Sequence, residues 1–165
     1  MKTLILIRHA KSDWHNLNAS DFDRELSSRG HHDAPVMAKR AVEKGLIPDL
    51  FVASPACRAM QTATLMAPHM SIPREQIVWK DELYLASPSM LLDTIRNTPD
   101  HINTLALLAH NPGITSLANR LCSSADIDNV PTSGMVYLKF EIDNWQKVGQ
   151  SGELIDFDYP KKRNS

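Results

Sequence analysis

The sequence has little cysteine, no long apolar run and almost no excess of charge, and each of these scarcities excludes a class of protein. Cys57 and Cys122 have no CxxC spacing and form neither a zinc cluster nor a disulfide framework, as is usual in a reducing compartment. A formal net charge of −1 gives no reason to expect nucleic acid as a partner. The longest apolar runs, at 4–7 and 105–109, are far shorter than the roughly 20 residues that cross a bilayer. With no signal-peptide pattern ahead of the first run, we expect a cytoplasmic protein that does not bind membranes.

The composition is that of an ordinary globular domain. The 165 residues, 42% of them hydrophobic and 22% charged, are enough to bury most of the apolar surface around one core. No internal repeat or low-complexity segment divides the chain. We therefore predict a single domain over residues 1–160, followed by a basic, mobile tail over residues 161–165.

Short apolar segments alternate with amphipathic ones along the chain. Apolar segments without polar alternation are typical of strands buried on both faces of a sheet. Strands are expected at 3–7, 49–53, 77–79, 104–109, 135–142 and 153–159. The segments between most of them carry apolar stripes at helical spacing. This order predicts an α/β fold, a three-layer α/β/α sandwich with a mostly parallel central sheet and a late antiparallel edge.

The first helix has clear signals at both ends. Ser27 or Ser28 can cap its start, and Gly45 is a natural stop. Pro35 costs little in a first turn, so the regular helix is expected to begin near His32.

A polar residue followed by proline indicates the start of each of three later helices. These pairs lie at 54–55, 87–88 and 111–112. In each pair we expect the serine or asparagine to be the N-cap and the proline to be the first helical residue.

Arginine or histidine follows three of the predicted strands at the point where each strand ends. Arg8 and His9 follow the first strand, Arg58 lies in the first turn after the second, and His110 follows the longest apolar run. Open α/β sheets bind ligands at the carboxyl ends of their strands, so these side chains can converge if the three strands are neighbours. A histidine after one strand is more often structural, but its recurrence with arginine at three strand ends favours a functional site.

Two arginines and two histidines form a group suited to phosphate. Guanidinium groups bind a tetrahedral dianion through several charge-assisted hydrogen bonds. A neutral imidazole among them can attack phosphorus and form a phosphohistidine that water hydrolyses, while the cations stabilise the charged oxygens. Arg8 and Arg58 should keep His9 unprotonated, because they disfavour a further positive charge.

Several motifs together resemble the histidine phosphatase superfamily. They are Arg8–Ser12 after the N-terminal strand, Ser54–Pro55 with Arg58 and Gln61–Thr62, and His110–Pro112, in the family's order over nearly the whole chain. The small size and the segment Asp21–Leu26 with Arg29–Gly30 look like the short branch of SixA-type phosphohistidine phosphatases. The resemblance implies a phosphoglycerate mutase-like fold, His9 as nucleophile, and a phosphate pocket of Arg8, Arg58 and His110.

The general acid is left open by the sequence. Mutase-like relatives carry a glutamate before a substrate-covering insertion, and the corresponding compact region here offers Asp81 or Glu82. Either residue can equally lie in a solvated turn, and the SixA-type branch often lacks a clear acid. Imidazole leaves phosphorus more readily than an alkoxide does, so a phosphohistidine substrate depends less on a proton donor.

The resemblance implies a metal-independent phosphatase without a cofactor, which forms a covalent intermediate on His9 and acts on phosphohistidine of a protein. The short chain leaves little room for a lid, so we expect an open pocket that also admits a small phosphoester. Lys11 and Ser12 either bind the substrate phosphate or lie in a solvated loop, and Tyr84 is interpreted as a packing or rim residue. The alternatives are a small-molecule phosphomonoesterase, a noncatalytic phosphate- or phosphoprotein-binding module, and a histidine metal site, which the lack of HxH and HExxH spacing disfavours.

Overall fold

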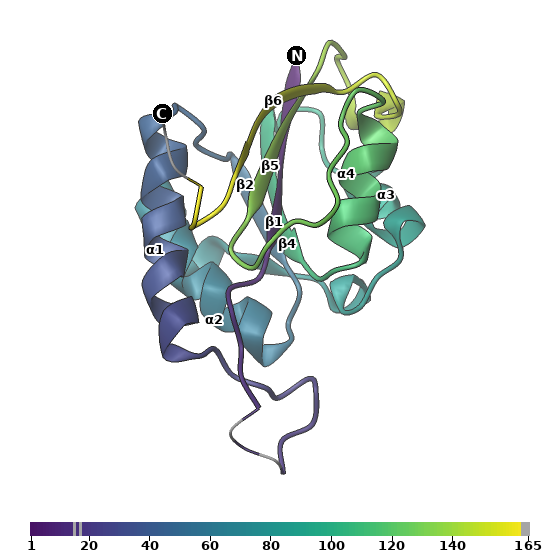
Figure 1. Cartoon of the computed structure of the whole chain (residues 1–165). Helices are drawn as coiled ribbons and strands as arrows, with labels where there is room; N and C mark the ends of the chain where they lie inside the picture. The colour runs from purple at the N-terminus through teal and green to yellow at the C-terminus, as the bar shows by residue number, and fades with distance from the viewer. Residues whose placement is uncertain (15, 17, 163–165) are drawn as a thin grey trace.

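The computed structural model describes residues 1–14, 16 and 18–162 and places a six-stranded sheet between layers of helices (Figure 1). The strands are β1 (Lys2–Arg8), β2 (Leu50–Ala53), β3 (Val78–Trp79), β4 (Thr104–Ala109), β5 (Met135–Phe140) and β6 (Glu153–Asp158). The α-helices are α1 (Ser28–Glu43), α2 (Cys57–Met66), α3 (Pro88–Arg96) and α4 (Gly113–Leu121). Short 3₁₀ helices complete the order: η1 (Ala67–Met70), η2 (Arg74–Gln76), η3 (Asp81–Leu83) and η4 (Trp145–Lys147). Every strand expected from the sequence is present.

The strand order brings three strand ends together. Across the sheet the order is β3-β2-β4-β1-β5-β6, in which β4 pairs in parallel with both β1 and β2. β5 runs antiparallel to β1, and β6 antiparallel to β5. The predicted mostly parallel sheet with a late antiparallel edge is therefore confirmed. Because β1 and β2 flank β4, the residues that follow these strands emerge side by side.

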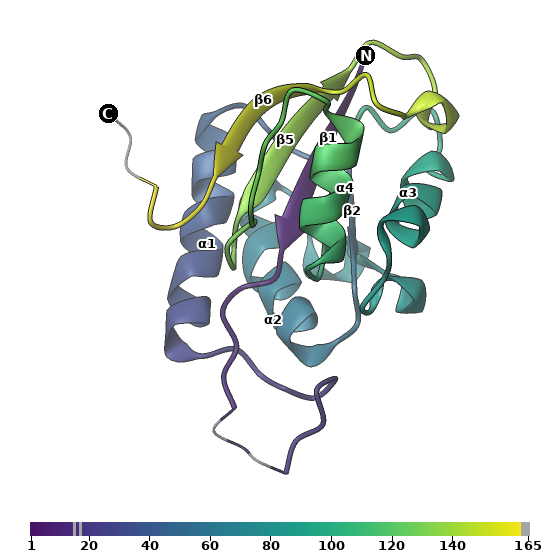
Figure 2. The same cartoon turned by 45° about the vertical axis from the view of Figure 1, so that its right-hand side comes forward.

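The two faces of the sheet carry separate apolar cores. Ile5 and Ile7 of β1 pack toward α1 and α2, whereas Leu4 and Leu6 pack toward α3 and α4. All four side chains are fully buried, which explains why the strand has no polar alternation. Figure 2 shows α4 crossing in front of the strands with α1 and α2 behind them. The three-layer α/β/α architecture predicted from the sequence is confirmed.

Helix α1 begins earlier than expected. The Ser27 side chain caps it by accepting a hydrogen bond from the Gly30 N–H at 3.2 Å, and Gly45 follows its end with a φ of 77°. Pro35 consequently lies inside the helix and not in its first turn. The ring leaves the carbonyl of His31 without its usual donor, but His31 is exposed, so water can satisfy that oxygen.

Only one of the three proline pairs marks a helix start as predicted. Ser87 caps α3 by accepting a hydrogen bond from the Met90 N–H at 3.3 Å. Helix α2 instead begins after Ala56 with no side-chain cap, and α4 begins after Pro112. Ser54 is freed from capping because its hydroxyl group serves another partner, described below.

The C-terminal segment is fixed against α1. Arg40 donates hydrogen bonds to the carboxylate of Asp158 at 3.1 Å and to the carbonyls of Tyr159 and Pro160 at 3.0 and 3.2 Å. The Lys162 ammonium contacts Asp156 at 3.2 Å. Of the expected basic tail, Lys161 and Lys162 are thus described, and residues 163–165 lie outside the described residues. Within those described ranges, no helix has the length and apolarity needed to cross a membrane.

Candidate active site

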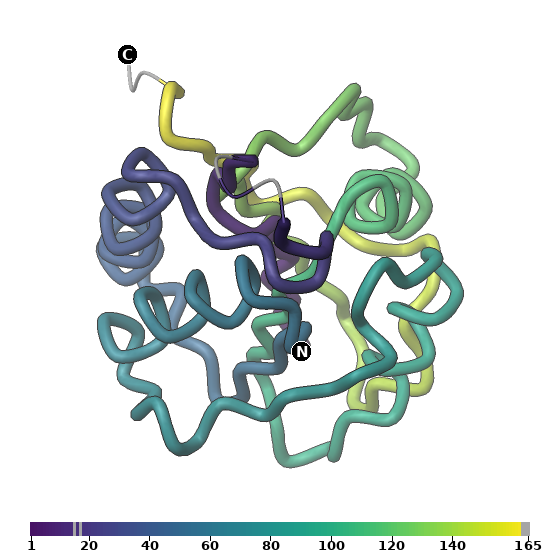
Figure 3. The backbone as a smooth tube through the Cα atoms, turned by 90° about the horizontal axis from the view of Figure 1, so that it is seen from below, coloured from purple at the N-terminus to yellow at the C-terminus, as the bar shows by residue number. Residues whose placement is uncertain are grey.

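The carboxyl ends of β1, β2 and β4 form one cavity. Seen from this end, the chain that leaves β1 passes over the centre of the molecule (Figure 3). The cavity has a volume of about 310 Å³ and is lined by Arg8, His9, Lys11, Ser12, Asp21, Arg24, Arg58, Leu85, His110, Asn111 and Thr132. The structure therefore brings together the four residues expected from the strand ends, and adds Lys11 and Ser12 to them.

The backbone beside His9 is held from two sides. The Ala10 N–H donates to Thr62 Oγ1 at 2.9 Å, and the same hydroxyl donates to the carbonyl of Arg58 at 2.7 Å. On the other side Lys11 packs against the first turn of α1, where a Cβ on Gly30 would lie 2.2 Å from the Lys11 carbonyl oxygen. The glycine is required for this close approach. Together these contacts fix His9 and Arg58 relative to each other.

The hydrogen bonds of His9 determine which ring nitrogen carries the proton. Nδ1 lies 2.7 Å from the carbonyl oxygen of Ala10, which accepts only, so Nδ1 carries the proton. Nε2 accepts a hydrogen bond from Arg58 Nε at 3.3 Å, so its lone pair faces the cavity side occupied by that guanidinium. His9 is buried, with 6% of its surface exposed. The residue is therefore a fixed, neutral imidazole with Nε2 as the nucleophilic atom.

Burial is the main reason that both site histidines are neutral. It lowers the pKa of His9 to about 3; the hydrogen bond to Ala10 acts in the opposite direction, and His110, Arg58 and Arg8 add further lowering. Burial, and then Arg58, lowers the pKa of His110 to about 4. The expectation that the arginines keep His9 unprotonated identified a real but smaller contribution. Desolvation of the ring contributes more.

These pKa values predict a loss of stability in acid. An unfolded histidine takes up a proton near pH 6.5, whereas folded His9 and His110 do so only near 3 and 4. The unfolded state therefore binds more protons below pH 6.5, and the free energy of unfolding falls by up to about 1.4 kcal/mol per pH unit for each histidine. Urea denaturation between pH 7 and 4 should show a shallower fall for His110→Gln than for the wild type.

The matched control for this measurement is His32→Asn, because His32 is exposed on α1. Its stability curve should run parallel to that of the wild type. A His110→Gln curve that is also parallel would contradict the assignment of acid sensitivity to the buried rings.

Two guanidinium groups flank the imidazole. Arg8 donates to the carbonyl of Val130 at 3.0 Å, and its Nε is buried without a partner among the described residues. Burial lowers the pKa of Arg8, and the charge of Arg58 lowers it further. Two like charges in one cavity are relieved by a bound anion, so the pair favours a ligand with several negative oxygens.

Ser54 orients the second histidine. Its hydroxyl oxygen accepts from the Ala56 N–H at 3.3 Å and lies 2.7 Å from His110 Nε2. Nδ1 of His110 is buried without a partner in the described part of the chain. In the tautomer in which Ser54 donates to Nε2, Nδ1 carries the proton and presents an unused N–H donor, as a phosphate oxygen requires.

The site also contains three residues that were not predicted to belong to it, namely Asp21, Arg24 and Tyr84. Asp21 accepts hydrogen bonds from Arg58, through its carbonyl at 2.7 Å and its carboxylate at 3.1 Å, and from the Tyr84 hydroxyl at 2.5 Å. Arg24 contacts the other carboxylate oxygen at 3.3 Å. Segment 18–24 therefore reaches the pocket, and Tyr84 lies at the rim, which was one of its two predicted places. The only sequence signal was that Asp21 and Arg24 lie in the segment that resembles SixA-type proteins.

The structure places Glu82 and Asp81 outside this group. Both are exposed in η3, where Leu83 is the residue that turns inward and is fully buried. Glu82 lines a separate cavity of about 340 Å³ beside β3 and α3. In the described ranges, no three His, Cys, Asp or Glu side chains gather as metal ligands.

A buried neutral histidine between arginines, at the carboxyl ends of parallel strands, defines an enzyme that handles a phosphoryl group through a histidine. Residues 4–83 match the sequence profile of the Histidine phosphatase superfamily (branch 1). The match covers about half of the chain, the fold is phosphoglycerate mutase-like, and these similarities support a phosphatase that acts through a histidine.

Relatives match most of the chain. An uncharacterized chloroplastic protein of Arabidopsis thaliana is 29% identical over 156 residues, which cover 89% of this chain and 70% of that protein. The candidate phosphohistidine phosphatase SixA from Agrobacterium tumefaciens is 29% identical with a TM-score of 0.78, over 96% of this chain and 99% of that one. The protein histidine phosphatase SixA complexed with tungstate has a TM-score of 0.81 over 96% and 97% of the two chains, and at 18% identity it shares the fold.

Proposed function

We propose that the chain hydrolyses phosphohistidine on a protein, without a metal ion, through a covalent intermediate on His9. In the first step the lone pair of His9 Nε2 forms a bond to phosphorus, and the bond from phosphorus to the substrate imidazole breaks. The departing imidazole takes the electron pair of that bond and leaves as a neutral group from the form of the substrate whose other ring nitrogen has first taken a proton from solvent. Water then attacks phosphorus, releasing phosphate and His9, and the proton from water passes to solvent.

One observation carries the choice of substrate class, namely that the described part of the pocket offers no protonated carboxylic acid to serve as general acid for a leaving group. Its only carboxylic acid is Asp21. Although partial burial acts to raise the pKa of Asp21, hydrogen bonds from Tyr84 and Arg58 and the charge of Arg58 hold it below the usual value, so the group is ionised. An alkoxide leaving group needs a proton and a neutral imidazole does not. A phosphoramidate therefore suits this pocket better than a phosphomonoester.

The remaining side chains are arranged to stabilise the transferred phosphoryl group. Arg8 and Arg58 supply charge-assisted donors to its equatorial oxygens, and His110 supplies the Nδ1–H. Lys11 and Ser12 line the same cavity and are proposed as further phosphate contacts. The likeness to the candidate phosphohistidine phosphatase from A. tumefaciens, at 29% identity over nearly the whole chain, supports the same substrate class.

Trapping of the intermediate tests this function. The protein is mixed in EDTA with a phosphohistidine-containing protein or phosphoramidate labelled with ³²P, and quenched in alkali within milliseconds. We expect alkali-stable, acid-labile label on the peptide that contains His9, with turnover unchanged by the chelator. Serine and tyrosine phosphoesters serve as comparison substrates and should be hydrolysed at least about 100-fold more slowly, since general acid catalysis contributes about 10²–10⁴-fold.

The possible results separate the candidates. Equal turnover of phosphoesters would favour a phosphomonoesterase, and loss of activity in EDTA would overturn the metal-independent mechanism. Binding of phosphate without turnover of any substrate would indicate a noncatalytic module.

A further inference from the structure

A second, larger groove adjoins the phosphate pocket. It has a volume of about 600 Å³ and is lined by Lys11, Arg29, Asp33, Pro131, Thr132, Tyr159, Pro160 and Lys161. Lys11 and Thr132 line both cavities, so the groove adjoins the site that holds His9 at these two residues. A substrate bound through its phosphoryl group can therefore extend into the groove.

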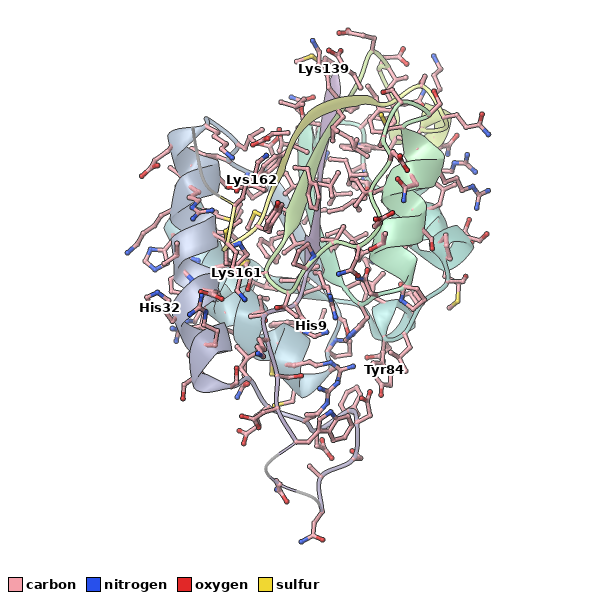
Figure 4. All side chains as sticks on the ribbon, in the orientation of Figure 1. His9, His32, Tyr84, Lys139, Lys161 and Lys162 are labelled. Atoms are coloured by element: carbon pink, nitrogen blue, oxygen red, sulfur yellow. The ribbon has the colours of Figure 1, made fainter. Side chains whose placement is uncertain are left out.

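One wall of this groove is firmly built. Residues 159–161 follow β6 across α1, and Arg40 holds the carbonyls of Tyr159 and Pro160 through hydrogen bonds of 3.0 and 3.2 Å. The guanidinium of Arg40 also pairs with Asp158, whose side chain is only 2% exposed. Lys161 is thereby set on a fixed edge and not on a free end. Figure 4 shows it between α1 and the sheet, whereas Lys139 lies near the opposite end of the sheet from His9.

The charge of the groove is positive and incompletely neutralised. Arg29 pairs with Asp33 at 3.2 Å, so these two charges cancel. The ammonium groups of Lys11 and Lys161 have no hydrogen bond or ion pair with any residue that the structure describes. The whole chain has a net charge of −1, so this excess of two positive charges is local. An anionic occupant is the one that such a groove stabilises.

We propose that this groove, with Lys161 on its wall and Lys11 shared with the phosphate pocket, binds acidic side chains that flank the phosphohistidine of the protein substrate. The proposal rests on the proposed function and adds to it the chemistry of the substrate surface. Phosphate in the pocket already occupies Arg8 and Arg58, so the anion in the groove is a separate group of the same molecule. On a protein, aspartate or glutamate beside the phosphorylated histidine supplies such a group at short range.

Two phosphohistidine peptides of equal length test the proposal, one with aspartate and glutamate on both sides of the phosphohistidine and one with asparagine and glutamine there. At low ionic strength the wild type should hydrolyse the acidic peptide with a kcat/KM about fivefold higher than that for the neutral peptide. A ratio of this size corresponds to the stabilisation by one exposed ion pair. The preference should disappear at about 0.5 M salt, where charges are screened within a few ångströms. Lys161→Gln should reduce it to less than about twofold, because the ion pair is removed.

Lys139→Gln is the matched control, since it removes the same charge far from the groove and should keep the fivefold preference. Hydrolysis of the neutral peptide should be the same in all three proteins, and it reports on the proposed function independently. If neither peptide is hydrolysed, the proposed function fails. If the wild type hydrolyses the two peptides at the same rate, or if Lys161→Gln slows both peptides equally, the groove does not bind the acidic residues beside the phosphohistidine. A preference confined to small molecules with a second phosphate would also overturn the proposal.

Discussion

Replacement of His9 by asparagine is expected to lower kcat/KM for a phosphohistidine substrate by about 10⁴-fold or more, since loss of a nucleophile removes the covalent route entirely. The variant is expected to fold. Asparagine can donate its amide N–H to the Ala10 carbonyl in place of Nδ1, and the Thr62 and Gly30 contacts that fix this backbone are untouched. Steady-state kinetics with the phosphohistidine peptide measure the effect, and circular dichroism checks the fold.

His32→Asn is the matched histidine control for this experiment. His32 is exposed on α1, outside the residues that line the pocket, so its replacement should leave kcat/KM within about twofold of the wild type. Retention of more than about 1% of wild-type turnover by His9→Asn would show that phosphoryl transfer does not pass through His9.

Replacement of Arg58 by lysine is expected to lower kcat by about 10²- to 10³-fold, the loss found when one preorganised donor to a developing anion is removed. Lysine keeps the positive charge but does not reproduce the planar arrangement of donors in the guanidinium group. Arg58 uses one planar group to reach His9 Nε2, the Asp21 carbonyl and the Asp21 carboxylate, at 3.3, 2.7 and 3.1 Å. A single ammonium cannot hold these directions together. The measurement is kcat for phosphohistidine hydrolysis, with inhibition by inorganic phosphate as a second readout of anion binding.

The matched arginine control is Arg74→Lys. Arg74 is exposed in η2 and donates only to the carbonyl of Thr64 at 3.3 Å in the hydrogen bonds described, so kcat should not change. If Arg58→Lys retained full kcat with weakened phosphate inhibition, Arg58 would contribute charge to ground-state binding and not to the transition state.

The sequence predicted what depends on strand order and apolar pattern. The apolar segment at 3–7 has no polar alternation, which predicts a strand buried on both faces of a sheet. That single inference placed Arg8 and His9 at the end of a buried strand. His110 followed from the same reasoning, because β4 is also buried and parallel, and Arg58 followed from the helix that begins shortly after β2. A residue directly after a buried strand has little freedom, so its position can be inferred from sequence alone.

Residues that reach the site through loops could not be predicted in this way. Asp21 meets Arg58 and Tyr84 across 37 and 63 positions of the chain, and the path of segment 18–24 decides that meeting. Glu82 was considered as an acid on its position in the chain, but the turn of η3 directs Leu83 inward and leaves Glu82 exposed. Ser54 has two possible partners, a helix N-terminus and an imidazole, and only the fold decides between them.

Asp21 also has a consequence for the end of the catalytic cycle. The Arg58 guanidinium is already neutralised by an aspartate on the same chain when no phosphate is bound. Product release therefore does not leave Arg58 as an unpaired buried cation, because the Asp21 carboxylate lies 3.1 Å from its guanidinium. This counter-ion lowers the cost of losing phosphate from a pocket with several strong anion donors.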